Sequence, residues 1–215
     1  MLALPGVPGF PDARTPFHML ELFHKGGPIM WPLLLLSIVA LTVVLERLVF
    51  IARERGRHGE ADVDEMLTQV ERGDPDAAAN MGISSRDFVA RALAYALTHR
   101  ERSFSEAMLR AANWELKRFN RGLTLLDTTV TLAPLLGLLG TVTGMIRSFG
   151  MLGGAELGAP SAITGGIAEA LIATAFGLGI AITALLPFNY LNARLEEARL
   201  EMQDAASHAE IHLKK

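Results

Sequence analysis

Three long stretches of the chain are almost entirely apolar, and segments rich in charge separate them. Apolar stretches of about 18 or more residues match the ~30 Å hydrocarbon core of a bilayer, because an α-helix rises about 1.5 Å per residue. The pattern predicts transmembrane helices over residues 28–51, 123–149 and 162–192. We therefore expect an all-α integral membrane protein with three transmembrane helices.

The basic residues predict on which side of the membrane each remaining segment lies. Twelve of the 20 Lys and Arg residues lie between Arg53 and Arg121. Because basic residues gather on the cytoplasmic side of membrane proteins, we expect a cytoplasmic helical domain over residues 52–122. The periplasmic parts are then residues 1–27, with a short interfacial helix, and the short loop 150–161, whereas residues 193–215 form a cytoplasmic C-terminal helix.

The cytoplasmic domain carries the start and stop signals of several short helices. The candidate caps are Asp62, Asp74, Ser84 and Ser103, and the candidate stops are Gly73 and Gly82. The last of these helices begins near Phe104 and meets only one weak point, Gly122, before the second span. We expect it to continue into the membrane as one helix.

The third span is also expected to continue as a helix beyond the membrane. Apolar and small residues recur there in steps of four and three, at Leu191, Leu195, Ala198, Met202, Ala205 and Ala209. Such a seam suits packing against neighbouring helices. The predicted fold class is thus a homo-oligomeric bundle in which three transmembrane helices have long cytoplasmic helical extensions.

Composition and charge narrow the possible functions. The net charge of −3 argues against nucleic acid as a partner, and the lack of cysteine excludes thiol chemistry and Cys-based metal sites. His208 and His212 have the i, i+4 spacing of a metal pair, but the adjacent Lys214 and Lys215 favour a solvated tail. We predict no metal and no other cofactor. The chain has none of the common catalytic motifs, so we do not expect an enzyme.

The second and third spans carry small residues at helical spacing. Gly137, Thr141, Gly144 and Ser148 share one face of the second span, and Ala170, Thr174, Gly177 and Ala181 share one face of the third. Small side chains allow close approach of membrane helices, so we assign a packing role to Gly137, Gly140, Gly144 and Gly177. One subunit is not expected to cover both faces, which predicts a homo-oligomer. Alternatively, the stripes serve packing and nothing else.

Glu169 is the only charged residue within the predicted third span. A charge near the bilayer centre costs roughly 2.5–3.5 kcal/mol on insertion scales, and such residues usually face a bundle interior or an aqueous path. Glu169 is therefore a candidate functional residue. The alternative is a carboxyl group that is tied to a neighbouring helix for structural reasons.

Three segments resemble the ExbB/TolQ/MotA proton-channel family, and ExbB most of all. They are Gly26–Leu48, Ala133–Ile146 and Gly165–Leu178. The resemblance implies a homopentamer of three-span subunits around a pore. Within that pore it implies two copies of an ExbD/TolR-like single-span partner, each with a protonatable aspartate. A TonB-like protein is a further candidate partner.

The resemblance also implies a function and a site. The function would be that of a proton-channel or stator subunit in the bacterial inner membrane, which uses the proton motive force to energise envelope transport or a related mechanical process. Thr141, Glu169 and Thr174 match the polar positions near the partner's aspartate and would form the proton pathway. On an ideal helix Thr174 lies about 140° from Glu169, so both cannot point straight into one lumen.

Two alternatives remain open at this point. The chain could be a MotA-like flagellar stator subunit, which is still a motor. It could also be a membrane scaffold that conducts no protons, in which case replacement of Glu169 by Gln would leave every energy-dependent function intact.

Overall fold

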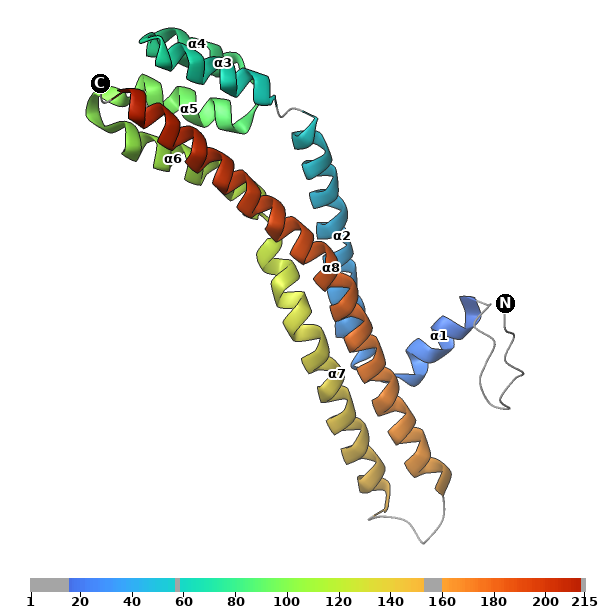
Figure 1. The fold of residues 1–215 in the computed structure, drawn as a ribbon. Helices are drawn as coiled ribbons and strands as arrows, with labels where there is room; N and C mark the ends of the chain where they lie inside the picture. The colour runs from blue at the N-terminus through green and yellow to red at the C-terminus, as the bar shows by residue number, and fades with distance from the viewer. Residues whose placement is uncertain (1–15, 57–58, 153–159, 214–215) are drawn as a thin grey trace, which may run out of the picture. The chain divides into compact units, whose positions relative to one another are not determined.

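The computed structural model describes residues 16–56, 59–152 and 160–213, and every regular element in this part of the chain is an α-helix. Figure 1 labels the eight described helices along the chain. They are α1 (Pro16–Lys25), α2 (Met30–Arg55), α3 (Glu60–Glu71), α4 (Pro75–Ser84), α5 (Phe88–Thr98), α6 (Arg100–Asn120), α7 (Leu123–Leu152) and α8 (Pro160–Leu213). The proline-rich start before residue 16 and most of the loop expected over residues 150–161 lie outside the described residues.

Three of these helices are long and apolar enough to cross a bilayer. The qualifying segments are Met30–Arg55, Leu123–Gly150 and Thr164–Leu213. Their most apolar windows are at most 28% buried within the chain, which leaves most of their apolar side chains available to lipid or to other chains. The prediction of an all-α membrane protein is confirmed.

The bounds of the helices differ from the predicted spans at several ends. Helix α2 begins at Met30 because Gly27 has a φ of +72°, which a regular helix does not allow. It then continues past residue 51 to Arg55. Helix α8 runs without a break from Pro160 to Leu213, so the predicted helical extension of the third span is present.

The expected continuous helix from Phe104 into the second span is wrong. Helix α6 ends at Asn120, and α7 begins only at Leu123. Gly122 between them has a φ of +82°, and a Cβ atom there would lie 2.8 Å from Cγ1 of Val43. The chain therefore turns at Gly122 because the backbone adopts a conformation that glycine favours.

Some of the predicted helix signals act as expected. The side chain of Asp74 accepts a hydrogen bond from the Ala77 N–H and caps α4. Ser103 marks a kink inside α6, where its hydroxyl oxygen accepts a hydrogen bond from the Glu106 N–H. Gly73, with a φ of +83°, follows the end of α3.

Other signals are misassigned. Helix α3 begins at Glu60, two residues before the expected cap Asp62. The N-cap of α5 is Asp87, not the expected Ser84. Helix α4 continues through Gly82, the expected stop, to Ser84. Gly82 is a packing position: a Cβ atom there would lie 2.6 Å from the backbone oxygen of Ala90. Close approach of two helices, not helix termination, explains this glycine.

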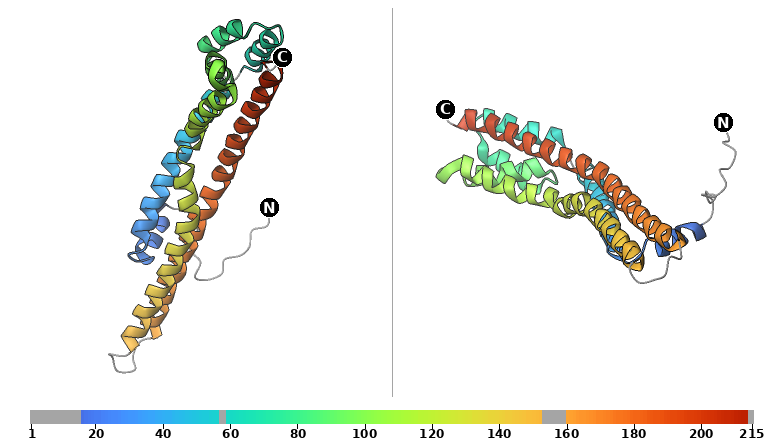
Figure 2. Two further views of the ribbon diagram at one scale, coloured as in Figure 1. Left: turned by 90° about the vertical axis from the view of Figure 1, so that its left-hand side faces the viewer. Right: turned by 90° about the horizontal axis from the view of Figure 1, so that it is seen from below.

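The chain forms two compact units, which are described separately. The first contains residues 1–40 and 128–184. In it α7 and α8 run side by side in opposite directions, as both Figure 1 and Figure 2 show. Its buried centre joins the start of α2 to both helices through Met30, Leu33, Ala133 and Ala181.

The second unit contains residues 41–127 and 185–215. Helices α3 to α6 pack around a buried apolar core, and the second half of α8 contributes to it. The contributing residues of α8 are Ala198, Met202, Ala205 and Ala209, which belong to the predicted seam. Leu195 of the same seam packs against this core with a partly buried side chain. The seam therefore packs within its own subunit.

Candidate functional site in the α7–α8 hairpin

The glycines assigned to packing lie where α7 meets α8. A Cβ atom on Gly177 would lie 2.6 Å from the backbone oxygen of Ala133, and one on Gly137 would lie 3.0 Å from Cα of Thr174. The corresponding nearest distances are 2.5 Å for Gly140 and 2.9 Å for Gly144. The backbones thus approach more closely than larger residues would allow. Because both helices belong to one chain, this part of the small-residue stripes serves packing within the subunit.

Glu169 forms an ion pair across this hairpin. Nη1 of Arg147, near the end of α7, lies 2.8 Å from Oε1 and 3.1 Å from Oε2 of Glu169, near the start of α8. The Glu169 side chain is 21% exposed and that of Arg147 is 51% exposed, so the carboxylate is the more enclosed member. An opposite charge at hydrogen-bond distance reduces the cost of placing a carboxylate in an apolar span.

Thr174 makes a different contact, deeper in the same hairpin. Its hydroxyl group donates to the backbone oxygen of Gly137 on α7 at 2.9 Å, with the Ala170 oxygen of its own helix at 3.3 Å. Five residues separate Thr174 from Glu169, which corresponds to about 7.5 Å along the helix axis. Thr174 therefore faces the seam between α7 and α8, in line with its wide angle from Glu169 on the helical wheel.

Thr141 lies on α7 and makes only a local contact. Its hydroxyl group donates to the backbone oxygen of Leu138, three residues earlier, at 2.6 Å, and its side chain is partly exposed. Within the described residues no hydrogen bond joins Thr141, Glu169 and Thr174 to one another. The three candidate residues thus occupy separate positions in one subunit and do not form a continuous proton relay.

Sequence reasoning missed two groups that contact Glu169. Arg147 pairs with its carboxylate, and the backbone of Gly27 lies so close that a Cβ atom there would overlap Oε1 of Glu169. Gly137 contacts Thr174, and Gly144 contacts Ala170. In an antiparallel hairpin each further step along α7 is matched by a step back along α8. Three steps from the contact of Gly144 with Ala170 bring Arg147 opposite Ile167. Ile167 lies two residues before Glu169, so the long arginine side chain reaches the carboxylate. This register comes from the fold, so the spacing of residues within each span did not indicate the pair.

The second unit contains a separate cluster of charges. Glu54 of α2 is buried, and its carboxylate lies 3.8 Å from Arg91 and 3.9 Å from Arg118. Arg91 also binds both carboxylate oxygens of Glu115, at 3.1 and 3.0 Å. Burial raises the pKa of Glu115. The hydrogen bonds from Arg91 and Arg118, together with their positive charges, lower it by more, so the pKa lies below its ordinary value of 4.5. Two carboxylates and two guanidinium groups balance each other in this cluster.

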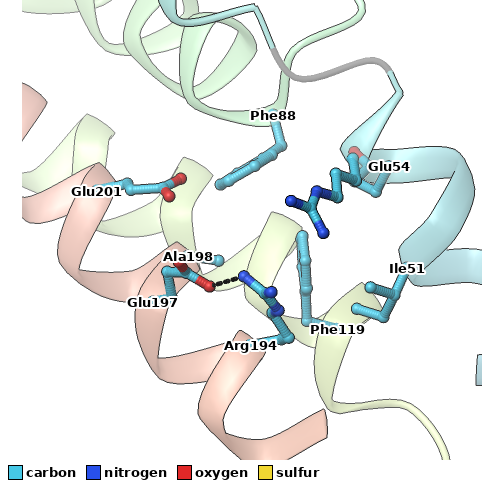
Figure 3. A pocket seen from close by; sticks show the side chains of 9 residues that line it. Ile51, Glu54, Phe88, Phe119, Arg194, Glu197, Ala198 and Glu201 are labelled. Carbon is cyan, nitrogen blue, oxygen red and sulfur yellow. Dashed lines mark hydrogen bonds and ion pairs between the residues drawn. The ribbon is translucent and has the colours of Figure 1, made fainter. Parts of the chain in front are cut away.

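Next to this cluster the second unit has an open pocket of about 230 Å³, which Figure 3 shows. The aromatic rings of Phe88 and Phe119 line one side. Arg194 and Glu197 from α8 form an ion pair on the other. Oε1 of Glu54, which also lines the pocket, has no hydrogen-bond partner within the described residues. The pocket thus combines an apolar wall with one ion pair and with a carboxylate oxygen that accepts no hydrogen bond from the described residues.

Comparison with known proteins gives one consistent result. Residues 83–204 match the model of the MotA/TolQ/ExbB proton channel family. The ExbB-like 1 biopolymer transport protein of Synechocystis sp. is 43% identical over 185 residues, which is 83% of this chain and 72% of that protein. The Tol-Pal system protein TolQ of Haemophilus influenzae is 40% identical over 89 residues, which is 41% of this chain and 39% of that protein. The biopolymer transport protein ExbB of Neisseria gonorrhoeae is 36% identical over 99 residues, which is 46% of this chain and 44% of that protein.

Proposed function

This chain belongs to the MotA/TolQ/ExbB proton channel family, and on that premise we propose that it is a stator subunit that couples proton flow to mechanical work. The work would be the energising of envelope transport, as the names of the ExbB relatives suggest. The observation that carries the proposal is the ion pair between Arg147 and the partly buried Glu169, because charged groups inside membrane spans mark ion pathways and proton relays.

The proposed site includes Glu169, Thr141 and Thr174. Glu169 would tune the local field or take part in proton movement, and Arg147 would hold its carboxylate in place. The partly exposed Thr141 would offer its hydroxyl group to a partner's carboxyl group or to a water chain. Thr174 would support the site through its hydrogen bond to Gly137, which ties α8 to α7.

The proposed partners rest on the family resemblance and agree with the surfaces that the chain leaves uncovered. Exposed apolar residues line α7 and α8, among them Leu135, Leu138, Leu139, Leu171 and Leu178. Further copies of the chain would cover part of this surface in a homo-oligomer, for which the family resemblance favours five copies. Two copies of an ExbD/TolR-like single-span partner with a protonatable aspartate would occupy the pore. A TonB-like protein is the candidate acceptor of the work.

The proposed setting is the bacterial inner membrane. The basic residues between Arg53 and Arg121 favour a cytoplasmic location for that segment. The N-terminus would then lie in the periplasm and the C-terminus in the cytoplasm. Single cysteine substitutions and a membrane-impermeant thiol reagent can test this orientation, because the 215-residue sequence contains no cysteine that would also react.

The direct test compares single and double replacements of the ion pair. Energy-dependent transport would be measured in cells that carry the chain and its partner, with oligomer yield as the assembly control. We expect Glu169→Gln and Arg147→Gln each to reduce transport strongly. Removal of one member leaves the other charge without its partner, which is unfavourable for a charge in an apolar span.

The double replacement separates a proton-handling role from a structural one. Removal of both charges of an ion pair is often neutral for stability. If Glu169 serves only to neutralise Arg147, the double variant regains transport. We expect the double variant to assemble normally and to remain inactive. Recovery of full activity would show that the pair is structural and would favour the non-conducting scaffold.

The flagellar alternative has its own test. The matched family model includes MotA, whereas the relatives reported above carry ExbB or TolQ names. Deletion of the chain should therefore impair an envelope transport process and leave swimming motility unchanged. Loss of motility with normal transport would reverse this assignment.

A further inference from the structure

Three side chains with metal-binding atoms meet in the second unit, where the end of α3 lies beside the last turns of α8. Oε1 of Glu71 lies 2.7 Å from Nε2 of His208 and 3.8 Å from Nε2 of His212. All three ligand atoms lie within 4.8 Å of one another. The fold thus adds a carboxylate, 137 positions away in the chain, to a histidine pair that by itself suggested only a solvated tail.

We propose that Glu71, His208 and His212 bind one Zn²⁺ ion. Two histidines and one glutamate are a known zinc ligand set, in which water or another ligand takes the fourth position. Around a tetrahedral ion with bonds of about 2.0–2.1 Å, neighbouring ligand atoms lie about 3.3 Å apart. The observed separations of 2.7 and 3.8 Å fall on either side of this value, so small side-chain rotations would complete the site.

The surroundings of the three ligands favour a cation and give it access. The side chains of Glu71 and His208 are 43% and 42% exposed. His212 lines a cavity of about 650 Å³ together with Glu101, whose carboxyl group favours positive charge. Arg100 lines the same cavity, but two hydrogen bonds to Asp76, at 2.8 and 3.0 Å, already engage its charge.

The zinc ion would join two elements that are distant in sequence. His208 and His212 are one turn apart on α8, and Glu71 is the last residue of α3. Without the ion, Glu71 contacts both histidines directly. The bound ion would replace these contacts with three coordinate bonds and fix the end of α3 against α8. This site does not depend on the proposed proton-driven function.

Calorimetric titration of ZnCl₂ into the full-length, chelator-treated protein in detergent tests the proposal. We expect one Zn²⁺ per chain, and a rise in melting temperature when the ion is present. His208→Ala and His212→Ala should each weaken binding by more than about tenfold, because loss of even an outer-shell contact weakens zinc binding by about 10–100-fold. X-ray absorption should show two histidine ligands at about 2.0–2.1 Å.

Two further variants distinguish a zinc site from a simple ion pair. Glu71→Gln keeps a hydrogen-bonding side chain but removes the anionic ligand, so it should weaken zinc binding and leave the helical content unchanged. His24→Ala removes an exposed histidine of α1 and should leave zinc binding unchanged. Absent or substoichiometric binding to the native chain would overturn the proposal. So would native affinity in a His208→Ala/His212→Ala double variant that retains its helical content.

Discussion

The backbone of Gly27 lies directly against the carboxylate of Glu169. A Cβ atom on Gly27 would lie 2.6 Å from Cδ of Glu169 and would overlap Oε1. Gly27 also has a φ of +72°, which residues with a side chain adopt at a cost of about 1–2 kcal/mol. The turn before α2 therefore contacts the one charged residue of the predicted third span, residues 162–192, near the start of α8.

Replacement of Gly27 by Ala should displace Glu169 and impair function. The added methyl group and the carboxylate cannot occupy the same space, so the contact with Arg147 has to change. We expect reduced proton-driven transport with normal membrane insertion, measured by transport assays and by the amount of protein in the membrane fraction.

Gly165→Ala is the matched control for this prediction. Gly165 lies on α8, four residues before Glu169, and a Cβ atom there would have no other atom within 4 Å in the chain. This variant should transport nearly as well as the native protein. Equal activity of Gly27→Ala and Gly165→Ala would show that the position of Glu169 does not matter for function.

The hydroxyl groups of Thr141 and Thr174 should matter for activity and not for assembly. Hydrogen bonds between membrane helices contribute about 0.6 kcal/mol on average, too little to dismantle an oligomer with many helix contacts. We expect Thr141→Ala and Thr174→Ala to lower transport while oligomer yield stays near the native value. Thr174→Ser keeps the hydroxyl group and should restore much of the activity.

Thr42→Ala is the control for the threonine variants. Thr42 has an exposed side chain on α2 and does not belong to the α7–α8 hairpin. Its replacement should leave transport almost unchanged. If all three alanine variants behave alike in the transport assay, Thr141 and Thr174 serve packing only. The polar assignment of the site would then be wrong.

The chain alone should leak few protons. Thr141, Glu169 and Thr174 make separate contacts in the subunit, and apolar stretches flank them, so a continuous hydrogen-bonded path is missing among the described residues. Apolar constrictions can close a pore by excluding water. Liposomes that contain only this chain should therefore hold a pH gradient almost as long as empty liposomes. Rapid collapse of the gradient would identify a channel that needs no partner.

The ion cluster around Glu115 should stabilise the second unit at neutral pH and lose this effect in acid. The pKa of Glu115 lies below its unfolded value of about 4.5, so its stabilising contribution is present above pH 4.5 and is lost as pH falls through the folded pKa. Glu115→Gln should lower stability at pH 7 by about 2 kcal/mol, less than the roughly 3–5 kcal/mol of a fully buried pair. The difference should shrink below pH 4.5.

Thermal unfolding of the full-length protein at several pH values measures this effect. Glu106→Gln, an exposed position on the same helix α6, is the control and should leave the melting temperature almost unchanged. A melting temperature of Glu115→Gln that equals the native value at pH 7 would show that Arg91 and Arg118 do not need this carboxylate.

The pattern of apolar residues was sufficient to predict the fold class and the three long helices. Burial in lipid requires long uninterrupted apolar stretches, and this requirement is visible in the sequence itself. The extension of α8 was also predictable, because Ala198, Met202, Ala205 and Ala209 repeat at helical spacing and lie in the core. These features depend on local spacing alone.

Features that depend on distant contacts were not predictable from local spacing. Gly122 and Gly82 are both glycines in helical surroundings, but the chain turns at the first and packs closely at the second. The contact of Arg147 with Glu169 needs the register of the hairpin, and that of Glu71 with His208 needs the position of α3 on α8. In each case the partner is far away in the sequence.

The close approach of Gly137 and Gly177 restricts how the hairpin can move. If α8 slid along α7 by one turn, about 5.4 Å, Ala173 or Ala181 would replace Gly177, beside the backbone oxygen of Ala133. That oxygen lies only 2.6 Å from the position of a Cβ atom, so the methyl group of an alanine would not fit. Close packing therefore prevents α8 from sliding along α7. In the proposed stator role, the hairpin would have to move as one piece, and sliding would be limited to its outer surfaces.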